Sequence, residues 1–276
     1  MIRLNEKKEA GDIDPQFVNL HTHSYYCGHG EGEISEYAEK AFDLGLKVLG
    51  YSEHCPVKEN RWRKSRMDYS QFPNYINDVK EAKAEYSGKL KILLGAECDW
   101  DVKNQYYSYY KDCLLSELGF DYLIIGSHSV NVGGEDLMVY KQPESKLILH
   151  KYTDNLISAM QSGLFLIVAH PDLFANTYRT WDQEAIACSR AILECAEETG
   201  TCLEINGNGL RKPMIKTPKG LRIPYPLEEF WRLAKNYDIK ISTSSDAHKP
   251  KDVAKIHSGI EFAKNLNLNL SWYSID

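Results

Sequence analysis

The strongest constraint on the fold is a regular alternation of short apolar segments with longer amphipathic segments. Strands are predicted where apolar residues run together, at 18–20, 48–51, 92–96, 122–125, 165–168, 202–205 and 240–243. Helices are predicted where apolar residues recur at helical spacing, at 34–44, 73–86, 105–118, 146–162, 184–199, 227–235 and 251–265. Apolar strands separated by amphipathic helices are typical of a parallel α/β sheet that is covered on its faces. Seven such strands favour a closed barrel.

Six of the seven apolar runs are followed by side chains that commonly bind metals. These side chains are His21 and His23, His54, Glu97, His128, His170, and Asp246 with His248; His29 lies a few residues after the first run. Imidazole and carboxylate ligands suit zinc, manganese or iron, and they reach a shared point only from the same end of neighbouring strands. We therefore predict a multinuclear metal site at the C-terminal ends of the strands.

The ligand pattern also separates a barrel from an open doubly wound sheet, which likewise gathers its loops at the C-terminal ends of its strands. In an open sheet the outer strands lie too far apart for six strands to serve one cluster. Closure brings those strand ends together. The longest irregular segments, 55–72, 129–144 and 206–225, follow strands, so we expect them to form specificity loops around the cluster.

Spacing supports individual ligands. His21 and His23 are two residues apart, so on an extended strand both imidazoles point to the same face. Either histidine alone could simply be hydrogen-bonded at a strand end. Because so many histidines follow predicted strands in this chain, that interpretation is improbable for the whole set. Glu97 directly follows an apolar strand, where a carboxylate can bridge two cations about 3.5–4 Å apart. The alternative interpretation is that Glu97 caps a helix or is a solvated surface charge.

The composition is that of one intracellular domain. With 276 residues, 43% of them hydrophobic, a single domain over 1–276 is expected, with 1–16 as an extension that is either a tail or a packed edge. The net charge of −6 argues against a general nucleic-acid partner, and no apolar run reaches the roughly 18 residues of a membrane helix. The seven cysteines follow no disulfide spacing. We expect a cytoplasmic protein with buried, reduced thiols, and no pattern specifies an oligomeric state.

Together, these residues resemble the complete ligand set of the polymerase-and-histidinol-phosphatase (PHP) superfamily, over about residues 17–265. Members of this superfamily are distorted (β/α)7 barrels that hold three divalent metal ions. The resemblance implies three ligand groups: His21, His23, Glu97 and Asp246 for one ion; Glu97, His128 and His170 for the second; and His29, His54 and His248 for the third. Zinc, manganese and iron all accept such ligands.

The amidohydrolases, a related class of barrel, also begin with a His-x-His pair and end with an aspartate. They lack counterparts of His29 and Glu97. They also often carry a bridging lysine after the fourth strand, where this chain has Gly126, Ser127 and His128. The PHP superfamily is therefore the closer resemblance.

Within the superfamily, the segments at 52–54, 95–97, 126–128 and 169–172 most resemble the stand-alone histidinol-phosphate phosphatases. This resemblance implies a metal-dependent phosphomonoesterase whose small-molecule phosphate ester is L-histidinol phosphate, hydrolysed in histidine biosynthesis without a covalent phospho-enzyme. Two alternatives stay open. One is another phosphoesterase, acting on protein phosphotyrosine, nucleotides or oligonucleotides, and the other is a non-enzymatic domain that metal ions stabilise.

Phosphate binding requires cations near the metals. Arg179 follows the strand that ends at His170, and Arg211 follows the sixth strand. An arginine fork can hold two phosphate oxygens, so we predict that both residues clamp the substrate. Asp172 is the candidate general acid for the leaving group.

Other charged residues near the strand ends have weaker signals. The charged run at 61–66 is expected to be a solvated or lid segment, since charge runs usually lie on solvated faces. The carboxylates of Glu53, Asp99 and Asp172 are candidates for facing the ammonium group of the substrate.

Overall fold

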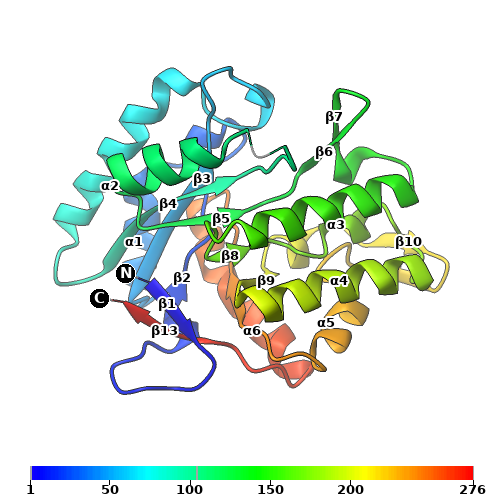
Figure 1. Ribbon diagram of the computed structural model, residues 1–276. Coiled ribbons are helices and arrows are strands. Elements are labelled where there is room, and N and C mark those ends of the chain that lie inside the picture. Colours follow the sequence, from blue (N-terminus) through cyan, green and yellow to red (C-terminus); the bar gives the residue numbers. More distant parts are fainter. Residues whose placement is uncertain (1, 104, 276) are drawn as a thin grey trace.

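The computed structural model describes residues 2–103 and 105–275, and a sheet of seven parallel strands forms its centre (Figure 1). In spatial order the strands are β12 (Ile241–Ser244), β9 (Cys202–Asn206), β8 (Ile167–Val168), β5 (Tyr122–Ile125), β4 (Lys91–Cys98), β3 (Val48–His54) and β2 (Val18–Asn19). All seven lie where strands were predicted. Because every neighbouring pair is parallel, the C-terminal ends of the strands meet at one end of the sheet.

The two edge strands, β2 and β12, close the sheet into a barrel. β2 is short, so the chain just beyond it and its side chains make the seam. Thr22 forms a parallel bridge with Ala247, and the His23 N–H donates to the Ala247 carbonyl at 2.8 Å. The Asn19 side chain donates to Ser245 Oγ at 2.7 Å. The predicted distorted (β/α)7 barrel is confirmed.

Helices cover the outside of the barrel. They are α1 (Ile34–Asp43), α2 (Phe72–Glu85), a π-helix (Tyr109–Glu117), α3 (Lys146–Gln161), α4 (Gln183–Thr199), α5 (Glu228–Ala234) and α6 (Ile256–Asn265). The third predicted helix is therefore of π type, and the last begins later than predicted because a 3-10 helix occupies Pro250–Lys255. α3 and α4 run side by side (Figure 1). Among the described residues, no helix is long and apolar enough to cross a membrane.

Side chains of the strands alternate between the barrel interior and the helix layer. In β4, Leu93 belongs to the interior cluster, whereas Leu94 packs in the outer core beneath the helices. Gly95 is in phase with Leu93 and leaves room for the Tyr122 ring, which a Cβ at Gly95 would overlap. Glu97 lies two residues after Gly95, so its side chain also points into the barrel. The period of two thus delivers Glu97 to the C-terminal mouth of the barrel.

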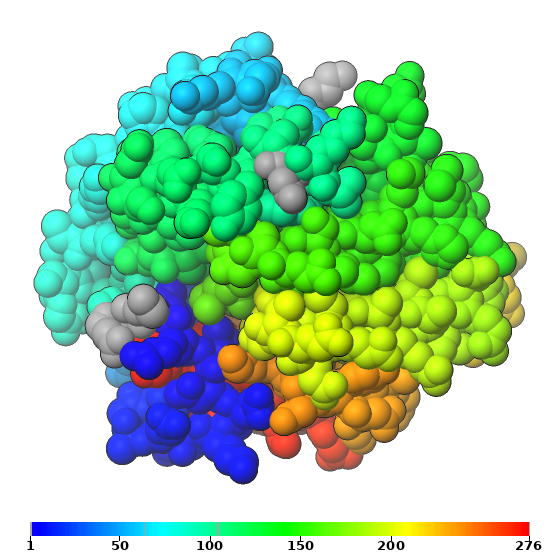
Figure 2. All heavy atoms as spheres, in the orientation of Figure 1, coloured from blue at the N-terminus to red at the C-terminus, as the bar shows by residue number. Residues whose placement is uncertain are grey.

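The N-terminal extension is a packed edge. β1 (Ile2–Asn5) pairs antiparallel with β13 (Trp272–Ile275), so the two ends of the chain lie together (Figure 1). Leu4 and Tyr273 pack into the interior cluster with Val18 and Val48, the first residues of β2 and β3. The pair therefore covers the N-terminal mouth of the barrel, opposite the predicted metal ligands. In Figure 2 the blue N-terminal segment forms one corner of the surface, with red C-terminal residues beside it.

Two hairpins lie within the predicted specificity loops. β6 (Ser129–Val132) pairs with β7 (Glu135–Met138), and β10 (Ile215–Thr217) pairs with β11 (Gly220–Arg222). The first hairpin projects from the body of the molecule beside the C-terminal mouth of the barrel (Figure 1). Both loops therefore have defined structure of their own.

Candidate metal centre

The side chains predicted to bind metals converge at the C-terminal mouth of the barrel, with Glu97 at their centre. Glu97 Oε1 lies 3.1 Å from His170 Nε2 and 3.5 Å from His128 Nε2. Glu97 Oε2 lies 2.8 Å from His54 Nδ1, 3.4 Å from His23 Nε2 and 3.6 Å from His21 Nε2. A carboxylate whose two oxygens face separate sets of histidines has the geometry of a ligand that bridges two cations.

Asp246 completes this group from the other side. Its Oδ1 lies 3.4 Å from both His23 Nε2 and His248 Nδ1, and 3.7 Å from His21 Nε2. His29 reaches the group through His248, because their Nε2 atoms are 3.1 Å apart. The structure therefore brings all nine predicted ligands together, seven of them as imidazoles.

The donor set fits divalent cations. The Nε2 atoms of His21 and His23 are 2.9 Å apart, and buried Glu97 Oε2 makes no hydrogen bond of good geometry despite the imidazole nitrogens around it. Buried polar atoms without partners are costly, and a shared cation removes that cost. Burial, together with His21, lowers the pKa of His23 to about 3, and burial, together with His23, lowers the pKa of His248 to about 4. These two rings are therefore neutral near pH 7, the form that binds metal. Glu97 and Asp99 outweigh burial at His128 and raise its pKa to about 9, so that ring would release a proton when it binds a cation.

Backbone geometry contributes to the convergence. His170 and Asp246 follow β8 and β12, and they adopt positive φ angles of 34° and 45°. Residues other than glycine rarely adopt such angles, and where they do, the surrounding structure holds them, often at functional sites. The turn after each of these strands thus places its ligand in the barrel mouth.

Three buried carboxylates lie close to the predicted metal ligands, and their contacts with those ligands were not predicted from the sequence. Glu53 Oε1 accepts from the Ser24 N–H at 2.5 Å, and its Oε2 lies 3.8 Å from His23 Nδ1. Asp99 Oδ1 accepts from the His128 N–H at 3.2 Å. Glu204, on β9, is the third. Because Glu53 and Asp99 are fully enclosed, the prediction that they face a substrate ammonium group is wrong.

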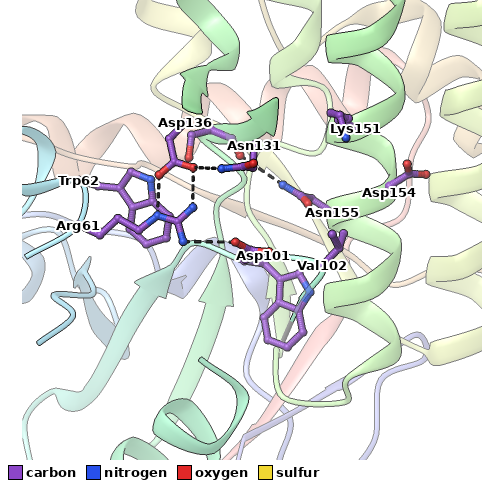
Figure 3. A pocket seen from close by; sticks show the side chains of 11 residues that line it. Arg61, Trp62, Asp101, Val102, Asn131, Asp136, Lys151, Asp154 and Asn155 are labelled. Atoms are coloured by element: carbon purple, nitrogen blue, oxygen red, sulfur yellow. Dashed lines mark hydrogen bonds and ion pairs between the residues drawn. The ribbon is translucent and has the colours of Figure 1, made fainter. Parts of the chain in front are cut away.

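Two arginines of the charged run at 61–66 are held by acidic partners, whereas Arg63 in the same run is exposed. Arg66 is 5% exposed, and its Nη2 lies 2.5 Å from Asp99 Oδ2. Arg61 is half-buried and holds Asp136 at 2.5 Å through two nitrogens, with its guanidinium over the Trp62 ring (Figure 3). Asp136 lies in β7, so this pair joins the loop after β3 to the β6–β7 hairpin beside a cavity of about 50 Å³. The expectation of a solvated segment is therefore wrong for Arg61 and Arg66, which have acidic partners on other loops, and the alternative of a lid segment stays a prediction.

A cavity of about 680 Å³ opens above the metal ligands. Arg211 lines it and donates to the carbonyls of Ser245 and Asp246 at 2.9 and 3.1 Å. Arg179 does not line it. Arg179 is exposed, donates to the Lys216 carbonyl at 3.3 Å and borders a separate cavity of about 410 Å³, so its placement contradicts the predicted clamp.

Asp172 is also remote from this cavity. Its side chain is completely buried, and its Oδ2 accepts from the Leu227 N–H at 2.5 Å and from Trp231 Nε1 at 3.0 Å. These bonds hold the start of α5 against the barrel. The structure therefore contradicts the prediction of Asp172 as general acid, because its carboxyl group has no access to a substrate.

Comparisons with known proteins agree with the fold and the site. Residues 19–208 match the PHP domain family. A probable histidinol-phosphatase of Deinococcus radiodurans is 29% identical over 84% of this chain and 86% of its own length. A probable histidinol-phosphatase of Schizosaccharomyces pombe is 23% identical, over 86% of this chain and 82% of its own. The chain belongs to the PHP domain family.

A solved structure supports the fold. It is histidinol phosphate phosphatase from Lactococcus lactis, complexed with zinc, L-histidinol and phosphate. It is 20% identical, with a TM-score of 0.67 over 92% of this chain and 94% of its own. Seven of the nine predicted ligands lie within the matched residues 19–208, and Asp246 and His248 lie beyond them.

Proposed function

We propose that this protein is a metal-dependent phosphomonoesterase that hydrolyses L-histidinol phosphate to L-histidinol and phosphate in histidine biosynthesis. The observation that carries the proposal is the position of Glu97, whose two carboxylate oxygens face two sets of histidines and suit two cations. The similarity to probable histidinol-phosphatases of Deinococcus radiodurans and Schizosaccharomyces pombe supports the substrate. The free state of all seven cysteines, six of them buried, supports a cytoplasmic location.

The residues for the ions are those of the centre, and we propose three ions of zinc, manganese or iron. His21, His23, Glu97 and Asp246 would hold one ion; Glu97, His128 and His170 the second; and His29, His54 and His248 the third. When bound, such ions lower the pKa of a water molecule and neutralise charge on the phosphoryl group. Glu97 belongs to the first two of these ligand groups, so its carboxylate would serve both.

The chain's own residues would bind and orient the ester. Arg211 lines the cavity beside Asp246, so it places positive charge where a phosphoryl group would meet the ions. Lys249 also lines the cavity, beside His248, but its Nζ lies 2.6 Å from Glu31 Oε1. Apolar side chains such as Leu173 line another part of the wall and suit the less charged leaving group. A cavity of about 680 Å³ is within the usual range for small-molecule sites.

One carboxylate remains for the ammonium group of the substrate. Among the described residues that line the cavity, Asp252 is the only acidic residue outside the nine ligands. It lies 4.0 Å from Arg211 Nε, so the same pair could face the two charged ends of one small molecule. We propose Asp252 for this contact in place of the buried carboxylates.

The test is a panel of phosphate esters assayed after chelation and after readdition of Mn²⁺ or Zn²⁺. We expect no hydrolysis without metal, and a kcat/KM for L-histidinol phosphate well above those for p-nitrophenyl phosphate, phosphotyrosine peptides and nucleotides. A preference for phosphotyrosine or nucleotides would overturn the substrate but not the metal chemistry. Absence of hydrolysis of every ester by the metal-loaded protein would favour a non-enzymatic domain.

A further inference from the structure

β9 is unusual among the seven strands of the barrel, because no predicted metal ligand follows it. It lies between β8 and β12, the strands that lead to His170 and Asp246. Leu203 and Ile205 of β9 face the helix layer, so the alternate positions face the interior. At the end nearest the metal centre, those interior positions carry two polar residues, Glu204 and Asn206, and both are 0% exposed.

Glu204 contacts two predicted metal ligands directly, and it also contacts a residue of β12 that lies two positions before a third ligand. Its Oε1 lies 2.8 Å from His21 Nδ1 and also accepts from Ser244 Oγ. Its Oε2 accepts from the His170 N–H at 3.0 Å. Glu204 is absent from the described lining of the large cavity, so it is placed to hold ligands and not to meet substrate.

Asn206 makes the corresponding contacts to Asp246. Its Nδ2 donates to Glu204 Oε2 at 2.7 Å and to Asp246 Oδ2 at 3.1 Å. Its Oδ1 accepts from the N–H of Asn208, whose own side chain donates to Asp246 Oδ2 at 3.2 Å. Two amide groups thus engage Asp246 Oδ2, which leaves Oδ1 to face the histidines of the centre.

From these contacts we infer that Glu204 and Asn206 are positioning residues of the metal centre, so that β9 orients ligands that its neighbouring strands supply. Glu204 fixes the His21 proton on Nδ1, which directs the Nε2 lone pair toward the cations. Asn206 selects the Asp246 oxygen that is offered to them. Carboxylates and amides behind metal ligands commonly set ligand orientation, and their loss weakens metal affinity. This inference rests on the metal binding proposed above.

The test compares Glu204→Gln and Asn206→Ala with the wild type and with Ser242→Ala. Ser242 is a matched control, since it is buried on the adjacent strand β12 and lies outside the centre. Zn²⁺ affinity is measured by competition with a chelator, the coordination geometry by the visible spectrum of the Co²⁺ form, and stability by thermal melting of the metal-free protein.

We expect Glu204→Gln and Asn206→Ala each to weaken affinity for at least one ion by about 10–100-fold and to change the Co²⁺ spectrum. Ser242→Ala should match the wild type. A purely structural role would lower the melting temperature while affinity and spectrum stay at wild-type values, and that result would overturn the inference. If Glu204→Gln does not fold, Asn206→Ala decides the question by the same criteria. A wild type that binds neither ion would instead refute the proposed function.

Discussion

Replacing Arg66 with methionine should strongly destabilise the metal-free protein. The Arg66 side chain is 2% exposed and that of Asp99 3%, with 2.5 Å between Nη2 and Oδ2, and Arg66 also donates to the Cys55 carbonyl at 2.8 Å. Methionine fills part of the volume but leaves the Asp99 charge buried without its partner. Breaking a buried pair in this way costs about 3–5 kcal/mol. At about 2–4 °C per kcal/mol, the expected fall in Tm is about 6–20 °C.

Arg63→Met is the matched control, because Arg63 lies in the same loop and its side chain is 68% exposed, 3.1 Å from Asp68. Exposed pairs contribute only about 0.2–1 kcal/mol, so this variant should melt close to the wild type. Both variants are melted in the presence of a chelator. If Arg66→Met loses no more stability than Arg63→Met, the account of a buried ion pair is refuted.

The effect of Arg66→Met should also depend on pH. Burial alone raises the pKa of Asp99, but the Arg66 and His128 charges outweigh burial and hold that pKa below its usual range. A lowered pKa in the folded state contributes stability that is present above the unfolded pKa and is lost as pH falls through the folded pKa. In the variant burial acts with less opposition, so Asp99 takes up a proton at higher pH. The difference in unfolding free energy should therefore shrink as pH falls from 7 toward about 4; a constant difference would contradict this reasoning.

Five further substitutions test the centre and the cavity. Glu97→Ala should abolish activity while circular dichroism stays native, because it removes a ligand and not core packing. Gly126→Ala should weaken metal affinity in chelator competition, since the added Cβ would overlap Glu97 Oε1. In steady-state kinetics Arg211→Ala should cost about 2–4 kcal/mol in kcat/KM, whereas Arg179→Ala, which borders a different cavity, should cost little. His150→Ala should turn over normally, because His150 is exposed and pairs with a surface glutamate, and a large loss there would question the choice of ligands.

The barrel and the positions of the nine predicted ligands could be read from local sequence. His54 and Glu97 directly continue apolar strands, so knowing the strand and its parallel neighbours fixes where the side chain lies. The same local reasoning failed for Arg179 and Asp172. Each lies in a loop, where contacts to distant segments decide the direction of the side chain, such as the Lys216 carbonyl for Arg179 and Trp231 for Asp172.

Glu204 and Arg66 differ in whether the sequence could have revealed them. Glu204 lies between Leu203 and Ile205 in an apolar strand, so the period of two already places its carboxylate inside the barrel. A buried carboxylate needs partners, and at that level of the barrel the nearby polar groups belong to metal ligands. The sequence therefore held a signal for Glu204. Arg66 had none, because its burial depends on Asp99, which follows a different strand, and no local pattern in a charged run distinguishes a buried arginine from a solvated one.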